Sequence, residues 1–165
     1  MTPETLWQRL QPFLAAANLD LTAHDEEWWL ETVKLVQDKL VHLPDYLAQC
    51  DFLLGDLVYQ PEQVSKAFAM PSALPVLEAL GSALKDISWT TEAIHGVFDE
   101  LKQNQPFKMK EIMWPIRAAL SGRTSGADLH QSIYLLGQAR VLSRLQEAQT
   151  YIKASAQDVK EGQAV

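Results

Sequence analysis

Six cations and a glycine-broken turn fall within one stretch of the chain, residues 107–145. This stretch holds six Lys or Arg against two acids, although the 165-residue chain as a whole has a formal net charge of −7. Clustered cations are what contacts with a phosphate backbone require. The stretch therefore predicts weak, salt-sensitive binding of nucleic acid, and chance clustering on solvated helix faces is the alternative. The six cations are Lys108, Lys110, Arg117, Arg123, Arg140 and Arg144.

Arg117 is the cation with the sharpest functional interpretation. It is the single Arg in an apolar segment that runs from Ile112 to Leu120. A guanidinium is costly to bury unless it is paired, so Arg117 should face a partner or the surface. Its planar fork can bond a base edge or a phosphate with two hydrogen bonds. A salt bridge to an acid on a neighbouring helix is the equal alternative. Trp114 could stack on an unpaired base, but core packing is the interpretation we favour for it.

Residues suited to catalysis or metal binding are present but not patterned. The four histidines lack metal-ligand spacing, and the acids at 25–27 fall in the first turn of a predicted helix, where the helix dipole favours them. No phosphate-binding loop or nucleophile motif is present. We therefore expect no catalytic and no metal site. The single cysteine, Cys50, excludes an internal disulfide and suits a reducing cytoplasm, where we expect it to be a small buried hydrophobe. The histidines are at positions 24, 42, 95 and 130.

The charge of the chain is segregated. Residues 1–60 carry ten acids against three Lys or Arg, whereas residues 107–145 are net positive. Such a protein can hold a phosphate backbone at one end while the other end repels wrong contacts. No apolar run approaches the ~18 residues of a membrane span, and the N-terminus lacks a signal-peptide pattern. We expect a cytoplasmic protein with no membrane contact.

The apolar residues recur with helical spacing throughout, and no segment alternates with period two, so we predict an all-α fold of about nine helices. Thr2-Pro3 and Thr90 or Thr91 are capping signals. Thr22 followed by Asp25 is similar to a capping box. Apolar positions continue that second helix as far as Leu43, before Pro44. The expected helices cover about 3–17, 23–43, 45–54, 61–69, 75–84, 91–102, 110–120, 127–136 and 138–154.

Two prolines four residues apart, Pro71 and Pro75, mark the best internal boundary, since they interrupt any helix that spans them. We therefore expect two packed helical sub-bundles, residues 1–70 and 71–154. The polar tail, residues 155–165, should be frayed.

The motifs within the cationic stretch have a further meaning when they are taken together. Trp-Pro-Ile-Arg at 114–117, Ser-Gly-Arg at 121–123, Leu-Leu-Gly at 135–137 and Arg-x-x-x-Arg-Leu at 140–145 resemble the C-terminal anticodon-binding domain of bacterial glutamyl-tRNA synthetase, a class I aminoacyl-tRNA synthetase. Weaker similarities at 29–40, 51–54 and 89–90 extend the resemblance over nearly the whole chain. It implies a cytoplasmic helical cage that recognises the anticodon of glutamate tRNA.

The resemblance also implies roles for single residues. Arg117 matches an arginine that contacts an anticodon base, and Leu129 matches a leucine near the splayed bases. Gly126 and Ala127 occupy the place of a Ser/Thr-Pro pair, and this departure removes a hydrogen-bond donor and a rigid ring. Lys39 stands where many members have the arginine credited with telling glutamate from glutamine anticodons, and lysine lacks the bidentate fork. The residues assigned to the phosphate backbone are Lys108, Lys110, Arg123 and Arg140.

The catalytic signatures of the synthetase, His-x-Gly-His and Lys-Met-Ser-Lys-Ser, do not occur in this sequence. We therefore expect no cofactor in this chain, since ATP and magnesium belong to the catalytic domain, and no aminoacylation by the chain alone. The expected partners are glutamate tRNA, through its anticodon arm, and the catalytic domain, and we expect a monomer. The alternative is a free-standing paralogue that acts as a helical tRNA- or protein-binding adaptor.

Overall fold

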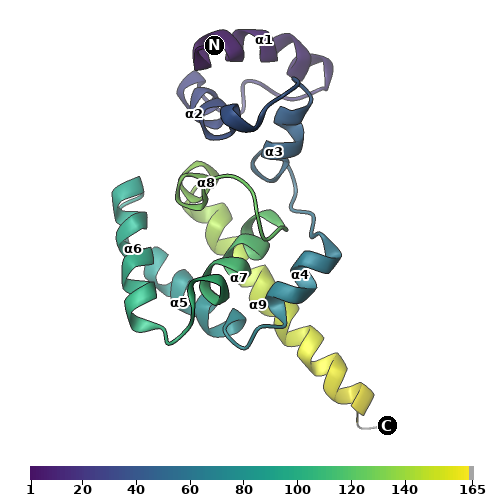
Figure 1. The fold of residues 1–165 in the computed structure, drawn as a ribbon, viewed down its shortest axis with the longest axis vertical. Coiled ribbons are helices and arrows are strands. Elements are labelled where there is room, and N and C mark those ends of the chain that lie inside the picture. The colour runs from purple at the N-terminus through teal and green to yellow at the C-terminus, as the bar shows by residue number, and fades with distance from the viewer. Residues whose placement is uncertain (164–165) are drawn as a thin grey trace. The chain divides into compact units, whose positions relative to one another are not determined.

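The computed structural model describes the backbone of residues 1–163 and the side chains of residues 1–155. Over this part of the chain the structure is entirely helical, with nine α-helices and one short 3₁₀ helix and no strand (Figure 1). The all-α prediction is therefore confirmed. The chain divides into two compact units, unit 1 over Met1–Asp56 and unit 2 over Leu57–Val165.

Unit 1 contains α1 (Pro3–Ala16), α2 (Glu26–Val36), the 3₁₀ helix η1 (Gln37–Lys39) and α3 (Asp45–Leu54). Its core is aromatic: Trp7 of α1 stacks on Trp29 of α2 with ring centroids 5.3 Å apart. The hydroxyl groups of Thr32 and Tyr46 share a hydrogen bond of 2.6 Å inside the core. The thiol of Cys50 is completely buried, as expected for a small hydrophobe.

The start and the end of the second helix differ from the sequence prediction. Asp25 caps α2 by accepting a hydrogen bond from the backbone N–H of Trp28, while the hydroxyl of Thr22 bonds to Asp20 instead. The helix ends at Val36 and not near Leu43. The side chain of Asp45 accepts hydrogen bonds from the backbone N–H groups of residues 41 and 42. These two hydrogen bonds stabilise a turn before α3, where the apolar spacing alone predicted more helix.

Unit 2 is built around its last helix (Figure 1). The long α9 packs along α5, α7 and α8, while α4 packs on α7 and α6 packs on α5 and α8. Pro61 occupies the first turn of α4 and the Thr90 hydroxyl caps α6, as the sequence predicted. The helices are α4 (Pro61–Phe68), α5 (Ala73–Leu84), α6 (Thr91–Asn104), α7 (Met109–Ser121), α8 (Leu129–Leu136) and α9 (Gln138–Gln163).

The boundary between the units lies after Asp56, earlier than the expected one at residues 70 and 71. The reason is that α4 packs on α7, so it belongs with the C-terminal helices. Pro71 lies in the turn before α5 and Pro75 falls in its first turn, where the missing N–H costs nothing. The expected fraying from residue 155 also differs from the structure, because α9 continues to residue 163. The final two residues lie outside the described part.

Among the helices that the structure describes, none is by itself long and apolar enough to cross a membrane. Only α4 and α5 taken together meet that criterion, and they are bent by 88° at the break between them.

Candidate nucleic-acid interface

The candidate interface is organised by α7 and by the loop that follows it. The backbone N–H of Lys108, just before the helix, donates to the Glu111 carboxylate at 3.1 Å and so fixes the start of α7. At the other end Gly122 adopts a left-handed conformation, with φ of 74°, and its N–H bonds to the carbonyl of Ala118. A glycine in this conformation closes a helix without a steric penalty.

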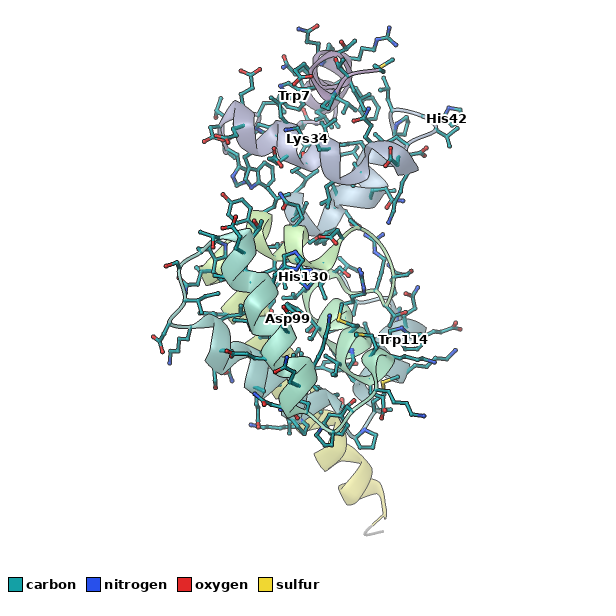
Figure 2. The ribbon with its side chains drawn as sticks, turned by 60° about the vertical axis from the view of Figure 1, so that its left-hand side comes forward. Trp7, Lys34, His42, Asp99, Trp114 and His130 are labelled. Carbon is teal, nitrogen blue, oxygen red and sulfur yellow. The ribbon has the colours of Figure 1, made fainter. Side chains whose placement is uncertain are left out.

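The N-terminal end of α7 presents two lysines to solvent. Lys108 and Lys110 are both exposed. The ammonium of Lys110 lies 4.0 Å from the centroid of the half-buried Trp114 ring, which is the geometry of a cation–π contact. Figure 2 shows Trp114 at the periphery of unit 2. This end of the helix thus offers mobile point charges beside an aromatic side chain, a combination that suits a phosphate backbone.

Arg117 reaches across the loop to a backbone carbonyl. Its Nη1 donates a hydrogen bond of 2.8 Å to the carbonyl of Ala127, and the side chain is half-buried. Burial lowers the pKa of the guanidinium below its usual value, and the nearby Asp128 carboxylate opposes this shift. The structure therefore joins Arg117 to Ala127, two residues that the sequence had singled out separately, through a backbone carbonyl.

The loop between α7 and α8 is held by the start of α4, a connection that sequence reasoning missed. The side-chain oxygen of Gln63 accepts hydrogen bonds from the backbone N–H and the hydroxyl of Thr124, at 3.0 and 3.3 Å. The backbone N–H of Gln60 donates to the carbonyl of Gly122 at 2.8 Å. No spacing signal could have revealed this contact, because 61 residues separate Gln63 from Thr124.

The other expected base-contacting residues of unit 2 differ in exposure. Gly126 is exposed and has a positive φ of 144°, a conformation that L side chains rarely adopt. Ala127 and Leu129 are each only 5% exposed and belong to the core. Asp128, between them, caps α8 by accepting from the N–H of Gln131. In this state the loop therefore presents its backbone to solvent more than its apolar side chains, and a contact of Leu129 with bases stays a prediction.

The cations in the loop and on α9 are more buried than their place in the sequence suggested. Arg123, in the loop, is half-buried. Arg140 is also half-buried; its Nε donates to the carbonyl of Leu136 at 2.9 Å, and burial lowers the pKa of its guanidinium. Arg144, which we expected to contact phosphate, is 7% exposed and donates to the carbonyl of Leu120 at 2.7 Å. The side chain of Arg144 therefore belongs to the interior of unit 2, although the sequence grouped it with the other five cations of the stretch.

Lys39 lies in the other unit, at the exposed end of η1. Within the described residues, no group of three or more His, Cys, Asp or Glu side chains is arranged to hold a metal ion. Two histidines do meet in unit 2: the rings of His95 on α6 and His130 on α8 are 4.0 Å apart.

The comparisons with known proteins agree with this architecture. Residues 5–149 match the family model of an anticodon binding domain. A glutamate–tRNA ligase of Saccharopolyspora erythraea is 34% identical over 152 residues, which are 88% of this chain and 30% of the relative. Another, of Symbiobacterium thermophilum, is 26% identical over 81% of this chain and 28% of its own length. The chain thus spans about 30% of the length of such relatives.

The fold has solved counterparts as well. A glutamate tRNA ligase from Elizabethkingia meningosepticum superposes with a TM-score of 0.81 at 20% identity, over 92% of this chain and 30% of that one. One from Elizabethkingia anophelis superposes with a TM-score of 0.77. These two likenesses concern the fold, whereas the family model matches the sequence from the first helix into the last. On that match, this chain belongs to the anticodon-binding domain family.

Proposed function

We propose that this chain binds the anticodon arm of glutamate tRNA as part of a glutamate–tRNA ligase. The observation that carries the proposal is the joining of Arg117 to the Gly122–Asp128 loop at one end of α7, with two exposed lysines at the other end, in a chain of the anticodon-binding family. A base reader needs a rigid donor set close to the bases and mobile cations on the flanking phosphates. Both kinds of group lie along α7.

Within this proposal Arg117 contacts a base edge. Its Nη1 is held by the Ala127 carbonyl, which orients the plane of the fork and leaves further N–H donors to recognise a base. Gly126 lets the RNA backbone approach the exposed loop closely. Leu129 would contact a splayed base only after the loop opens, because its side chain is buried.

Contacts with the phosphate backbone of the RNA are assigned to the exposed Lys108 and Lys110. Arg123 and Arg140 are assigned to the same role, but these side chains are half-buried, so each can contact phosphate only through its exposed part. Lys39 is assigned to the discrimination of anticodons. An ammonium there supplies charge without a bidentate fork, so we expect weak discrimination between glutamate and glutamine anticodons.

The chain itself is proposed to bind neither ATP nor magnesium and to activate no amino acid. The support is that the two catalytic signatures are missing from the sequence and that the part matched here is 28% and 30% of the length of the two relatives. We place the protein in the cytoplasm, as a monomer, beside a synthetase catalytic domain. Glutamate-dependent ATP–pyrophosphate exchange by this chain above the blank would contradict the proposal.

The decisive experiment compares two tRNAs that differ only in the anticodon. Arg117→Ala should weaken binding of the glutamate anticodon by ~1–3 kcal/mol and narrow the gap between the two tRNAs. Lys110→Ala is the matched control from the same helix, and it should weaken both tRNAs equally, because phosphate contacts carry no sequence information. Circular dichroism must show parental helicity in each variant.

Two outcomes would redirect the assignment. If Arg117→Ala weakens both tRNAs equally, Arg117 contacts phosphate and the base reader lies elsewhere. If the parent chain binds neither tRNA with any dependence on the anticodon, the helical adaptor becomes the better interpretation of the fold.

A further inference from the structure

Arg144 is a buried cation in the middle of α9. Its side chain is 7% exposed, and its Nη1 donates a 2.7 Å hydrogen bond to the carbonyl of Leu120, 24 residues earlier. Burying a guanidinium is costly unless it is hydrogen-bonded. A cation is also favoured at the C-terminal end of a helix, where the last carbonyls carry partial negative charge. Arg144 meets both conditions at the last turn of α7.

The last turn of α7 is the part of the helix that carries the candidate interface. Arg117 lies one turn before the helix ends at Ser121, and its Nη1 crosses to the Ala127 carbonyl. The Ser121 hydroxyl donates to the carbonyl of Arg117 at 2.8 Å, and Gly122 begins the loop. Any movement of the Leu120 carbonyl therefore moves the backbone of Arg117 and the first residue of the loop together.

The loop is held independently on its other side. The N–H of Gln60 bonds to the Gly122 carbonyl, and Gln63 bonds to Thr124. The anchor from α4 fixes the loop, and the anchor from α9 fixes the helix end from which Arg117 projects. Only the second anchor depends on a charged side chain.

We infer that Arg144 is a positioning residue for base readout: it fixes the end of α7 so that Arg117 and the Gly122–Asp128 loop keep the spacing that an anticodon base requires. This inference rests on the proposed function. A positioning role for Arg144 can be told apart from a direct contact with phosphate. A positioning residue alters the choice between anticodons, whereas a phosphate contact alters the salt dependence of all tRNAs.

The test measures the affinity of the whole chain for two tRNAs that differ only in the anticodon, at several salt concentrations. Arg144→Met keeps an unbranched side chain but removes the charge and the donor. The ratio of the two affinities should fall by about tenfold, within the range by which residues that do not touch the ligand alter its recognition. The slope of affinity against salt should stay at the parental value. Partial unfolding cannot mimic this result, since it scales both affinities equally.

Leu145→Ala is the matched control. Leu145 is the next residue on α9, is buried, and faces Gly81 of α5, so its truncation destabilises unit 2 without touching the Leu120 carbonyl. It should leave the affinity ratio unchanged. If Arg144→Met fails to fold, Arg144→Lys, which keeps the charge but not the planar fork, replaces it, with an expected fall of about threefold.

Hydrogen exchange without RNA separates this inference from the proposed function. Arg144→Met should speed exchange of the Gly122 and Thr124 amides beyond the general increase seen in Leu145→Ala. Equal exchange in the two variants would overturn the inference. So would a salt slope reduced by about one with an unchanged affinity ratio, the mark of a phosphate contact. If the parent chain does not discriminate between the tRNAs, the proposed function fails, and the exchange comparison alone decides whether Arg144 fixes the end of α7.

Discussion

At the N-terminal end of α7, Lys108 and Lys110 are exposed, whereas at its C-terminal end the cations donate to backbone carbonyls. Arg117 reaches the carbonyl of Ala127, and the buried Arg144 reaches that of Leu120. The lysines are available as mobile charges, while the arginines use donors to hold the chain in one geometry. One cationic stretch in the sequence therefore contains two populations, one suited to attracting a polyanion and one suited to shaping the surface that reads it.

Gly122→Ala, at the C-terminal end of α7, should have the largest effect on the free energy of unfolding. The residue has a left-handed φ of 74°, and a Cβ there would overlap the Val58 carbonyl oxygen and lie 2.9 Å from its carbonyl carbon. We expect the free energy of unfolding to fall by about 2–4 kcal/mol, measured by urea denaturation. Gly96→Ala is the control, because that glycine lies inside α6 with open space around its Cα, and it should stabilise by about 0.5–1 kcal/mol. Equal effects would mean that the close approach of Val58 does not constrain the loop.

Gln63→Ala, which affects the loop after α7, should have the next largest effect on the free energy of unfolding. It removes the acceptor of two hydrogen bonds from Thr124 and leaves a half-buried N–H without its partner. We expect a loss of about 1–2 kcal/mol in the free energy of unfolding. Gln60→Ala is the control, because Gln60 bonds to the Gly122 carbonyl through its backbone N–H. The stability of this variant should remain close to that of the parent. A loss confined to Gln60→Ala would contradict the anchoring of the loop by Gln63.

The lysines should affect binding and not stability. Changing both Lys108 and Lys110 to Ala removes two exposed charges. Raising the salt from about 50 to about 200 mM should then weaken tRNA binding less than in the parent, by a factor of roughly 7 to 12, because two fewer counterions are released. Filter binding across a salt series measures this. Lys34→Ala in unit 1, whose ammonium pairs with Glu31 at 2.8 Å, should leave the series unchanged. If the variant without both lysines keeps the salt dependence of the parent, the lysines at the N-terminal end of α7 do not contact phosphate.

The smallest expected effect on stability concerns His130, in the first turn of α8. Burial lowers its pKa below the ordinary value of 6.5, and the neighbouring His95 and Lys102 lower it further, while Asp128 and Asp99 oppose the shift. In the unfolded chain the imidazole therefore takes up its proton at a higher pH than in the fold. Its contribution to stability is full above about pH 6.5 and is lost as the pH falls through the lower folded value.

His130→Gln should therefore flatten the acid side of the stability profile. The change should be less than about 1 kcal/mol between pH 7.5 and pH 5, since solvent screens a partly exposed ring. Urea denaturation at several pH values measures it. A parental slope in His130→Gln would show that other groups cause the loss of stability in acid.

The sequence predicted most of the helices because their ends are marked by local chemistry. Thr2 with Pro3, Pro61 and Thr90 each begin a helix where expected, since caps and first-turn prolines act within one turn. The prediction for 23–43 failed where Asp45 accepts hydrogen bonds from the backbone N–H groups before it. Apolar spacing cannot register such a competing hydrogen bond.

The sequence predicted which residues form the candidate site, but not what their side chains pack against. The motif identified Arg117 and the loop residues, yet it grouped Arg144 with the exposed cations. Whether an arginine on α9 faces water or the end of α7 depends on packing between segments 24 residues apart, which no local pattern encodes. The same holds for Gln63, whose importance arises only from contact with a loop distant in sequence.

Cys50 allows the opening of unit 1 to be measured by thiol labelling. It is the single cysteine of the chain, and its thiol is fully buried in unit 1. A thiol reagent can modify the chain only when unit 1 opens, so the labelling rate reports the local stability of one unit without any engineered probe. RNA that contacts only unit 2 should leave that rate unchanged, whereas engagement of Lys39 should slow it.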